Sequence, residues 1–402
     1  MGTCQIENLI KNKWPGFHGI VKCQFPSLPI DCDNLCILHS QRLDKDRVNF
    51  FSAIQNKLDN NDFDFKFVLF PAAISFEDQE FSYDADFEDA IFICSADFSK
   101  AKFRKLANFT AAEFCGITYF KQAEFHGDTI FSFADFNDEA DFTASEFNAF
   151  SIFEGTNFAK YVEFLFSIFS GRSIFVDIDG KFSANFQDVE LKNDGSLQFQ
   201  NLSLANCSFN ECDLRLVRFN NVEWRIYYGR KVIYNEFYYK HDRFYKGQKW
   251  IYPLLEQLYR YLKINYESQF DYKNSGDFHY GEMEMHRRAS KWRWFPFYWY
   301  NLYWVLSGYG ERPSRALGWL AAFLAIFTGF LAWAGLNLDP KHIPAFGDYF
   351  FYLLQKVTLQ RPSWAEPVGF GGKLVAGISV LLIPGQAALF LLALRNRLGR
   401  RR

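Results

Sequence analysis

Near the start of the chain lie four cysteines and one histidine, residue types whose side chains can bind zinc. A cysteine and a histidine three residues apart, in the run Cys36-Ile37-Leu38-His39, could bind one ion from a single turn. Tetrahedral zinc with three thiolates and one imidazole fits this ligand set. We therefore predict a structural zinc site with the ligands Cys4, Cys23, Cys36 and His39. Cys32 is the spare cysteine, and the alternative is that these are free thiols in a folded cap.

The N-terminal region that carries these residues would benefit from a bound metal ion. Residues 1–40 contain three prolines and little periodic apolar pattern, so they have no obvious hydrophobic core. Metal binding can supply the missing folding free energy. Residues 1–17 lack a basic start followed by an apolar run, so we expect a reducing cytoplasmic environment, where disulfides are rare.

A second group of polar residues lies between two long apolar segments near the end of the chain. Residues 316–338 and 374–394 are 23 and 21 residues without a charge, and each can cross a hydrocarbon core of about 30 Å. Residues 346–359 form an apolar, aromatic run too short to cross, predicted as a surface helix or a re-entrant half-helix. The candidate pore-loop residues are Lys356, Thr358, Gln360 and Arg361.

This order of span, half-helix and span resembles the pore module of two-span potassium channels. That family needs a T-V-G-Y-G filter, whereas this chain has Lys356-Val357-Thr358-Leu359-Gln360-Arg361-Pro362, so potassium selectivity is not supported. Lys356 and Arg361 would repel cations and favour anions or block conduction. In the second span, Pro384 gives a kink point and Gln386 a polar side chain able to face neighbours.

Basic and aromatic residues predict how the spans lie in the membrane. Residues 292–306 are rich in Trp and Tyr, which favour the membrane interface. Lys and Arg flank the outer ends of the pair, in residues 287–315 and 395–402, so we expect both termini on the cytoplasmic side of a bacterial inner membrane.

Phenylalanine, with 49 residues, forms a ladder in the middle of the chain. From Phe76 to Phe175 the gaps between ladder positions alternate five and six without exception, and from Phe199 the spacing is five throughout. A helix needs a period of 3.6 and a strand a period of 2, so the pattern predicts a solenoid in which these side chains point at one axis. Small residues often lie two positions before the ladder Phe, as in Ala85-Asp86-Phe87.

These repeats resemble the pentapeptide-repeat family. The resemblance implies a right-handed quadrilateral β-helix with four faces per coil, roughly 22 residues per turn and a rise near 4.8 Å, so that residues 76–224 would make about seven coils. Residues 259–263 and 276–285 look like the linker that follows the repeats in membrane-bound members. The resemblance extends from Cys36 to Arg395 and fixes the fold better than the function.

The predicted fold is therefore a β-solenoid followed by an α-helical linker and an α-helical transmembrane domain. Residues 1–60 would be the cap, 61–225 the β-helix, 226–311 the linker with an interfacial aromatic helix, and 312–402 the two-span membrane domain.

Charge and missing motifs restrict the function. Residues 76–175 hold 18 Asp and Glu against 7 Lys and Arg, while residues 225–402 hold 12 against 25. The acidic outer faces of the solenoid, with Asp84, Asp97 and Asp135, could bind a basic protein, and a nucleic-acid partner is not expected. No phosphate loop or nucleophile elbow is present, and His279, Glu282 and His286 lack the H-E-x-x-H order, so we predict no enzyme.

Two functions remain open from the sequence. The first is a cytoplasmic solenoid that binds a partner and is coupled to an oligomeric, channel-like pore in the bilayer. The alternative is a membrane-anchored scaffold with no conduction, which asks nothing of residues 346–362.

Overall fold

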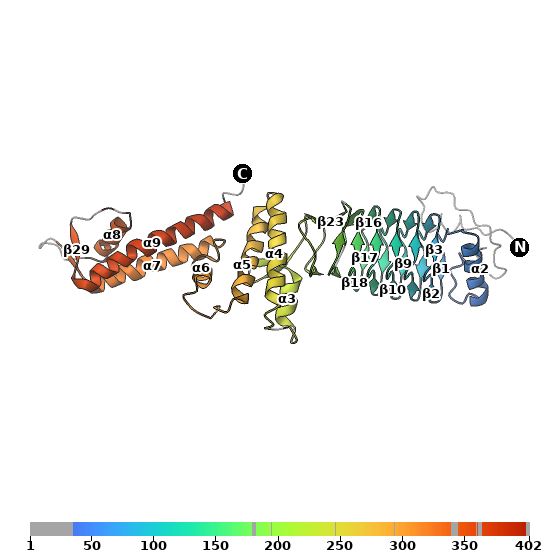
Figure 1. Cartoon of the computed structure of the whole chain (residues 1–402), viewed down its shortest axis with the longest axis horizontal. Coiled ribbons are helices and arrows are strands. Elements are labelled where there is room, and N and C mark those ends of the chain that lie inside the picture. Colours follow the sequence, from blue (N-terminus) through green and yellow to red (C-terminus); the bar gives the residue numbers. More distant parts are fainter. Residues whose placement is uncertain are drawn as a thin grey trace. The chain divides into compact units, whose positions relative to one another are not determined.

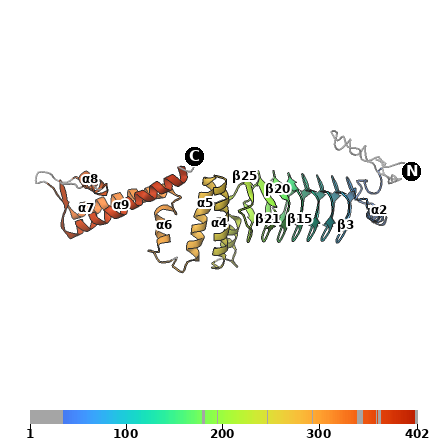
Figure 2. The same ribbon diagram turned by 45° about the horizontal axis from the view of Figure 1, so that its top comes forward.

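The chain folds into a β-solenoid unit and a helical unit (Figure 1, Figure 2). A computed structural model describes residues 35–178, 182–193, 195–245, 247–292, 294–338, 345–358, 360 and 364–398. The two units are Met1–Lys246 and Gly247–Arg402.

Four parallel sheets form the walls of the solenoid, and each strand pairs with strands one coil away. The first sheet contains β1 (Leu69–Phe70), β5 (Ile91–Phe92), β9 (Glu113–Phe114), β13 (Asp135–Phe136) and β17 (Asn157–Phe158). The second contains β2 (Ile74–Ser75), β6 (Ala96–Asp97), β10 (Thr118–Tyr119), β14 (Ala140–Asp141), β18 (Tyr161–Glu163), β21 (Ser183–Asn185) and β24 (Asn206–Ser208). The third contains β3 (Glu80–Phe81), β7 (Lys102–Phe103), β11 (Glu124–Phe125), β15 (Glu146–Phe147), β19 (Ile168–Phe169) and β22 (Glu190–Leu191). The fourth contains β4 (Ala85–Asp86), β8 (Ala107–Asn108), β12 (Thr129–Ile130), β16 (Ser151–Glu154), β20 (Arg172–Val176), β23 (Ser196–Gln200) and β25 (Arg218–Asn220).

Stacked phenylalanine rings fill the interior of the solenoid. The register pairs Phe70 with Phe92, which confirms the predicted coil of 22 residues. Phe120 stacks on Phe98 at 4.9 Å and on Phe142 at 4.8 Å between ring centroids, with the planes nearly parallel. Four such columns run along the axis, starting at Phe65, Phe70, Phe76 and Phe81. Each aromatic pair adds about 0.5–1.5 kcal/mol beyond its buried area.

The turns between sheets explain the alternation of five and six residues. Each gap of five contains a residue with positive φ two positions after a ladder Phe, and these residues recur every eleven positions, as at Asp78, Asp89 and Lys100. The Asp of the Ala-Asp-Phe pattern closes the same turn, since Asp97 Oδ1 accepts a hydrogen bond from the Ser99 backbone N–H at 2.9 Å. These aspartates therefore have a structural role in addition to their negative charge.

Both ends of the solenoid are covered. At the N-terminal end, Phe50 of α2 (Arg47–Asp59) packs edge-on against Phe70, and Lys45 Nζ donates to the Leu69 carbonyl at 2.8 Å. At the other end lie the hairpin β26 (Arg225–Tyr227) and β27 (Arg230–Val232) and helix α3 (Tyr234–His241). The Asn235 amide of α3 donates to Ser208 Oγ at 2.8 Å. Such caps protect the backbone edges that a solenoid would otherwise expose.

The helical unit begins with a hairpin of two long helices, α4 (Ile251–Ser268) and α5 (Tyr272–Ala289), followed by the short α6 (Trp299–Ser307). Gly281 of α5 makes room for the ring of Tyr259 in α4, because a Cβ at this glycine would lie 2.6 Å from the ring. In the part of the chain that the structure describes, two helices are long and apolar enough to cross a membrane, α7 (Pro313–Ala334) and α9 (Gly369–Leu398).

The segment between these two helices folds back onto them. The predicted first span of 316–338 extends too far, because Gly335 has a φ of +87° and ends α7, and β28 (Leu336–Leu338) pairs with β29 (Ala365–Pro367). Helix α8 (Phe346–Val357) packs Tyr349, Tyr352 and Leu353 into a core shared with α7 and α9.

Candidate functional site

The predicted zinc ligands are only partly visible. Cys36 Sγ and His39 Nδ1 lie 3.3 Å apart and both side chains are buried, as one turn carrying two ligands requires. Cys4, Cys23 and Cys32 lie outside the described residues. Within the described ranges, no group of three His, Cys, Asp or Glu could hold a metal ion. The zinc site remains a prediction.

The predicted pore-loop residues gather at the C-terminal end of α8. Lys356 is half-buried in the last turn. The Thr358 hydroxyl donates to the Leu354 carbonyl at 3.0 Å, and the Gln360 backbone N–H donates to the Gln355 carbonyl at 2.9 Å. Arg361 lies outside the described residues. The structure therefore places Lys356, Thr358 and Gln360 together, and their role in conduction remains a prediction.

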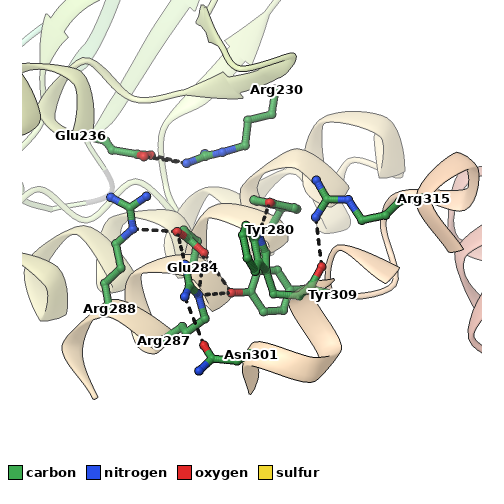
Figure 3. A network of polar contacts seen from close by, with 10 residues as sticks. Arg230, Glu236, Tyr280, Glu284, Arg287, Arg288, Asn301, Tyr309 and Arg315 are labelled. Atoms are coloured by element: carbon green, nitrogen blue, oxygen red, sulfur yellow. Dashed lines mark hydrogen bonds and ion pairs between the residues drawn. The ribbon is translucent and has the colours of Figure 1, made fainter. Parts of the chain in front are cut away.

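A buried polar network lies in the helical unit where α5 and α6 meet the start of α7 (Figure 3). Its centre is the Glu284 carboxylate of α5, which is 4% exposed. It accepts hydrogen bonds from Arg287 Nη2 at 2.9 Å, Arg288 Nε at 2.7 Å and the Tyr309 hydroxyl at 2.9 Å. Burial would raise the pKa of Glu284, but the two guanidinium groups outweigh it and lower that pKa. The carboxylate is therefore charged and fully paired.

Tyr309 reaches this network from an unusual turn between α6 and α7. Gly308, Tyr309 and Gly310 all have positive φ, at 57°, 59° and 75°. A Cβ at Gly310 would lie 2.7 Å from the Tyr303 hydroxyl, so this position requires glycine. Tyrosine rarely adopts positive φ, and its full burial shows that packing holds it there. Burial also raises the pKa of Tyr309, which keeps its hydroxyl protonated as a donor.

Trp304 of α6 connects the network to α7. Arg287 lies over its indole ring at 4.7 Å and Arg315 of α7 at 5.6 Å. Arg315 Nη1 donates to the Trp304 carbonyl at 3.0 Å, and the indole N–H donates to the Tyr280 hydroxyl at 2.8 Å. Cation–π contacts of this kind contribute about 0.5–2 kcal/mol each. Helices α5, α6 and α7 are thus joined by side chains that are both charged and packed.

Helix α9 enters the same junction through two amides. Gln386 Nε2 donates to the Leu306 carbonyl at 3.0 Å and to the Ala316 carbonyl at 2.8 Å. Asn396 Nδ2 donates to the Gly310 carbonyl at 3.0 Å. Gln386 is 2% exposed, and the neighbours that its side chain faces are α6 and α7 of the same chain. Its amide is used inside the chain because Leu306 at the end of α6 and Ala316 near the start of α7 offer carbonyl acceptors.

The residues that resembled a metal motif on α5 form a second ion-pair cluster. Glu282 accepts from Arg260 Nε at 2.9 Å and Lys263 Nζ at 2.7 Å, both on α4. Burial would raise the pKa of Glu282, but hydrogen bonds from His279, Lys263 and Arg260 lower it to about 2. The interpretation of this segment as a packed helix fits these contacts.

In this arrangement the Glu284 carboxylate is paired with Arg287 and Arg288. Helices α5, α6, α7 and α9 are joined by hydrogen bonds around the turn at Tyr309. Sequence reasoning missed the site because Glu284, Tyr309 and Gln386 are far apart in the chain. The paired glycines around Tyr309 were the one available signal. Comparisons of the chain with protein-family models, with curated proteins and with solved structures found no match.

Proposed function

We propose that this chain is a pentapeptide-repeat protein anchored in a bacterial inner membrane, where its solenoid binds a protein partner on the cytoplasmic side. The main support for the proposal is that the polar side chains of the two apolar segments are buried and hydrogen-bonded within the chain. Thr328, Ser379 and Gln386 are the hydroxyl and amide side chains of residues 316–334 and 374–394, and all three are buried. Each donates a hydrogen bond to a carbonyl of the same chain, at 2.7, 2.8 and 2.8 Å respectively.

The outward surface of α7 and α9 is correspondingly apolar. Trp333 and Leu381 are 86% and 77% exposed in the isolated chain. Exposed apolar surface of this extent is suited to lipid rather than water. Trp294 and Phe297, just before α6, are 82% and 73% exposed and suit the membrane interface. These features support an anchor made of two spans and an aromatic belt.

The solenoid surface supports a basic protein partner. Five of the seven Lys and Arg side chains in residues 76–175 form ion pairs with neighbouring carboxylates: Lys100, Lys102, Arg104, Lys121 and Lys160. Since 18 carboxylates share this segment, a negative excess remains on its outer faces. Such a field steers and orients a positively charged partner.

A homo-oligomer is part of the proposal. Gly318, Ala321, Ala325 and Gly329 are exposed along α7 at spacings of three and four. Small residues at this spacing let membrane helices approach closely. Association of two or more copies through α7 would place several solenoids together on one membrane patch and raise their avidity for a multivalent partner.

Liposome reconstitution of the full-length protein tests the anchor against the channel. We expect the protein to remain with the membrane after alkaline carbonate extraction and to give no ion flux, because a pore needs polar groups along its wall and Thr328, Ser379 and Gln386 are buried inside the chain. Flux in the wild-type protein whose selectivity changes in the variant Lys356→Gln, Arg361→Gln would contradict the proposal and establish a pore at this loop.

We also propose that the N-terminal cap binds one structural zinc ion. The buried contact between Cys36 and His39 supports it. We expect elemental analysis of the purified protein to give one zinc per chain, and Cys36→Ser to lose it, since structural zinc needs its complete ligand set. Cys94→Ser is the control, because Cys94 is exposed on the solenoid. Equal zinc content in both variants would exclude Cys36 as a ligand.

A further inference from the structure

A cavity of about 640 Å³ lies where α8, β29 and the first turns of α9 meet. This volume is in the range of roughly 300–1,000 Å³ that small-molecule sites occupy. Its polar wall consists of Tyr352 and Lys356 from α8, Glu366 from β29 and Lys373 from α9. All four residues belong to the helical unit.

The charged residues of this cavity are not used by the fold. Lys356, Glu366 and Lys373 make no ion pair or side-chain hydrogen bond with any residue that the structure describes. This contrasts with α5 of the same unit, where Glu282 and Glu284 are paired with Arg and Lys side chains. Among the described lining residues, two ammonium groups and one carboxylate therefore give a net positive charge that is available to a ligand.

An apolar face of α9 continues from the charged wall. Ala376, Gly377, Val380 and Leu381 line the cavity and recur at spacings of one, three and one along α9, so they share one side of the helix. Gly377 has no neighbouring atom within 4 Å of the position of a Cβ, so there is open space beside this face. The cavity is therefore amphipathic, with cations at one end and aliphatic side chains at the other.

The position of the cavity in the spans is also informative. Lys373 lies in the second turn of α9, and the basic residues Arg395 and Arg397 lie in its last turn. If α9 crosses a bilayer, the cavity is at the interface opposite the basic end. Basic residues concentrate on the cytoplasmic side, so two unpaired lysines at the other interface need a different reason.

We infer that this cavity binds a phospholipid. Its phosphate would lie between Lys356 and Lys373, and one acyl chain would lie along Gly377 and Leu381. Glu366 would pair with an ammonium group, which phosphatidylethanolamine carries and phosphatidylglycerol lacks, so phosphatidylethanolamine is preferred over phosphatidylglycerol. The inference rests on the proposed membrane anchoring of the two apolar helices.

Native mass spectrometry of the full-length protein in detergent, titrated with phosphatidylethanolamine, tests this site. We expect the double variant Lys356→Gln, Lys373→Gln to weaken binding by about tenfold, since each cation contributes to holding the phosphate. Gly377→Leu should weaken it similarly by filling the acyl path. Gly385→Leu is the matched control, because Gly385 is also in α9 with open space around it and does not line the cavity.

Further measurements distinguish a bound phospholipid from a free phosphate ion and from a lipid without a phosphate group. Inorganic phosphate that displaces the lipid at equal concentration would overturn the inference in favour of a free anion, and equal binding of diacylglycerol would overturn the phosphate contact. Unchanged lipid binding in both cavity variants would overturn the site itself. A protein extracted by carbonate would refute the anchor, whereas a membrane-integrated protein with no lipid selectivity would refute the cavity alone.

Discussion

Glu284→Gln is expected to destabilise the helical unit by about 3–5 kcal/mol, since removing one partner of a buried ion pair leaves the other charge uncompensated. The amide has nearly the same shape as the carboxylate, so packing is preserved. The guanidinium groups of Arg287 and Arg288 would both lose their shared acceptor, and the Tyr309 hydroxyl would lose a charged one. Thermal unfolding of the full-length protein in detergent, followed by circular dichroism, measures the loss.

Asp277→Asn is the control for this substitution on the same helix. Asp277 is half-buried, and its oxygen lies 3.6 Å from Arg312 Nη2. A looser, partly solvated pair of this kind contributes about 0–1 kcal/mol. The pH dependence is a second check. The pKa of Glu284 is lowered below its ordinary value of 4.5, so its stabilising effect is complete above that pH and is lost as the pH falls through the lowered pKa. The difference between wild type and Glu284→Gln should therefore shrink in acid, and a constant difference would argue against the ion pair.

The Phe ladder made the solenoid predictable from the sequence. The long-range polar contacts could not be predicted in this way. Every ladder position from Phe76 to Phe175 is buried. The spacing of five and six residues in the sequence matches the spacing of the inward-facing positions in each coil. The network around Glu284 has no period: it depends on which turn of α5 lies beside the turn at Tyr309, and only tertiary packing decides that. The same reason explains Gln386, whose polarity was visible but whose acceptors lie 70 and 80 residues earlier.

The apolar helices were predictable in composition but not in their ends. Hydropathy gave a first span up to residue 338, yet α7 ends at Ala334. Gly335 and the strand β28 that follows it are also uncharged, so a count of charged residues cannot detect where α7 ends. The cavity beside Lys356 was equally hidden, since it depends on the packing of α8 against α9.

Phe131→Ala is expected to destabilise the solenoid by about 3–5 kcal/mol, the usual cost of removing a buried aromatic ring. Phe131 is fully buried and stacks on Phe109 at 4.9 Å and on Phe153 at 5.0 Å. Its edge contacts with Phe120 and Phe142 are at 5.5 and 5.6 Å. The substitution therefore interrupts one column and loosens a second. Urea unfolding of the full-length protein measures the change in the free energy of unfolding.

Phe133→Ala, two residues away, is the matched control because it removes the same atoms from a different environment. Phe133 is 59% exposed at a turn and has a φ of +59°. A surface truncation of this kind changes stability by about 0.5 kcal/mol or less. Each coil contacts only its neighbours, so the loss in Phe131→Ala should appear as a lower urea midpoint for the solenoid while the helical unit keeps its own transition. Equal effects of the two substitutions would mean that general hydrophobicity, rather than the stacked column, stabilises the solenoid.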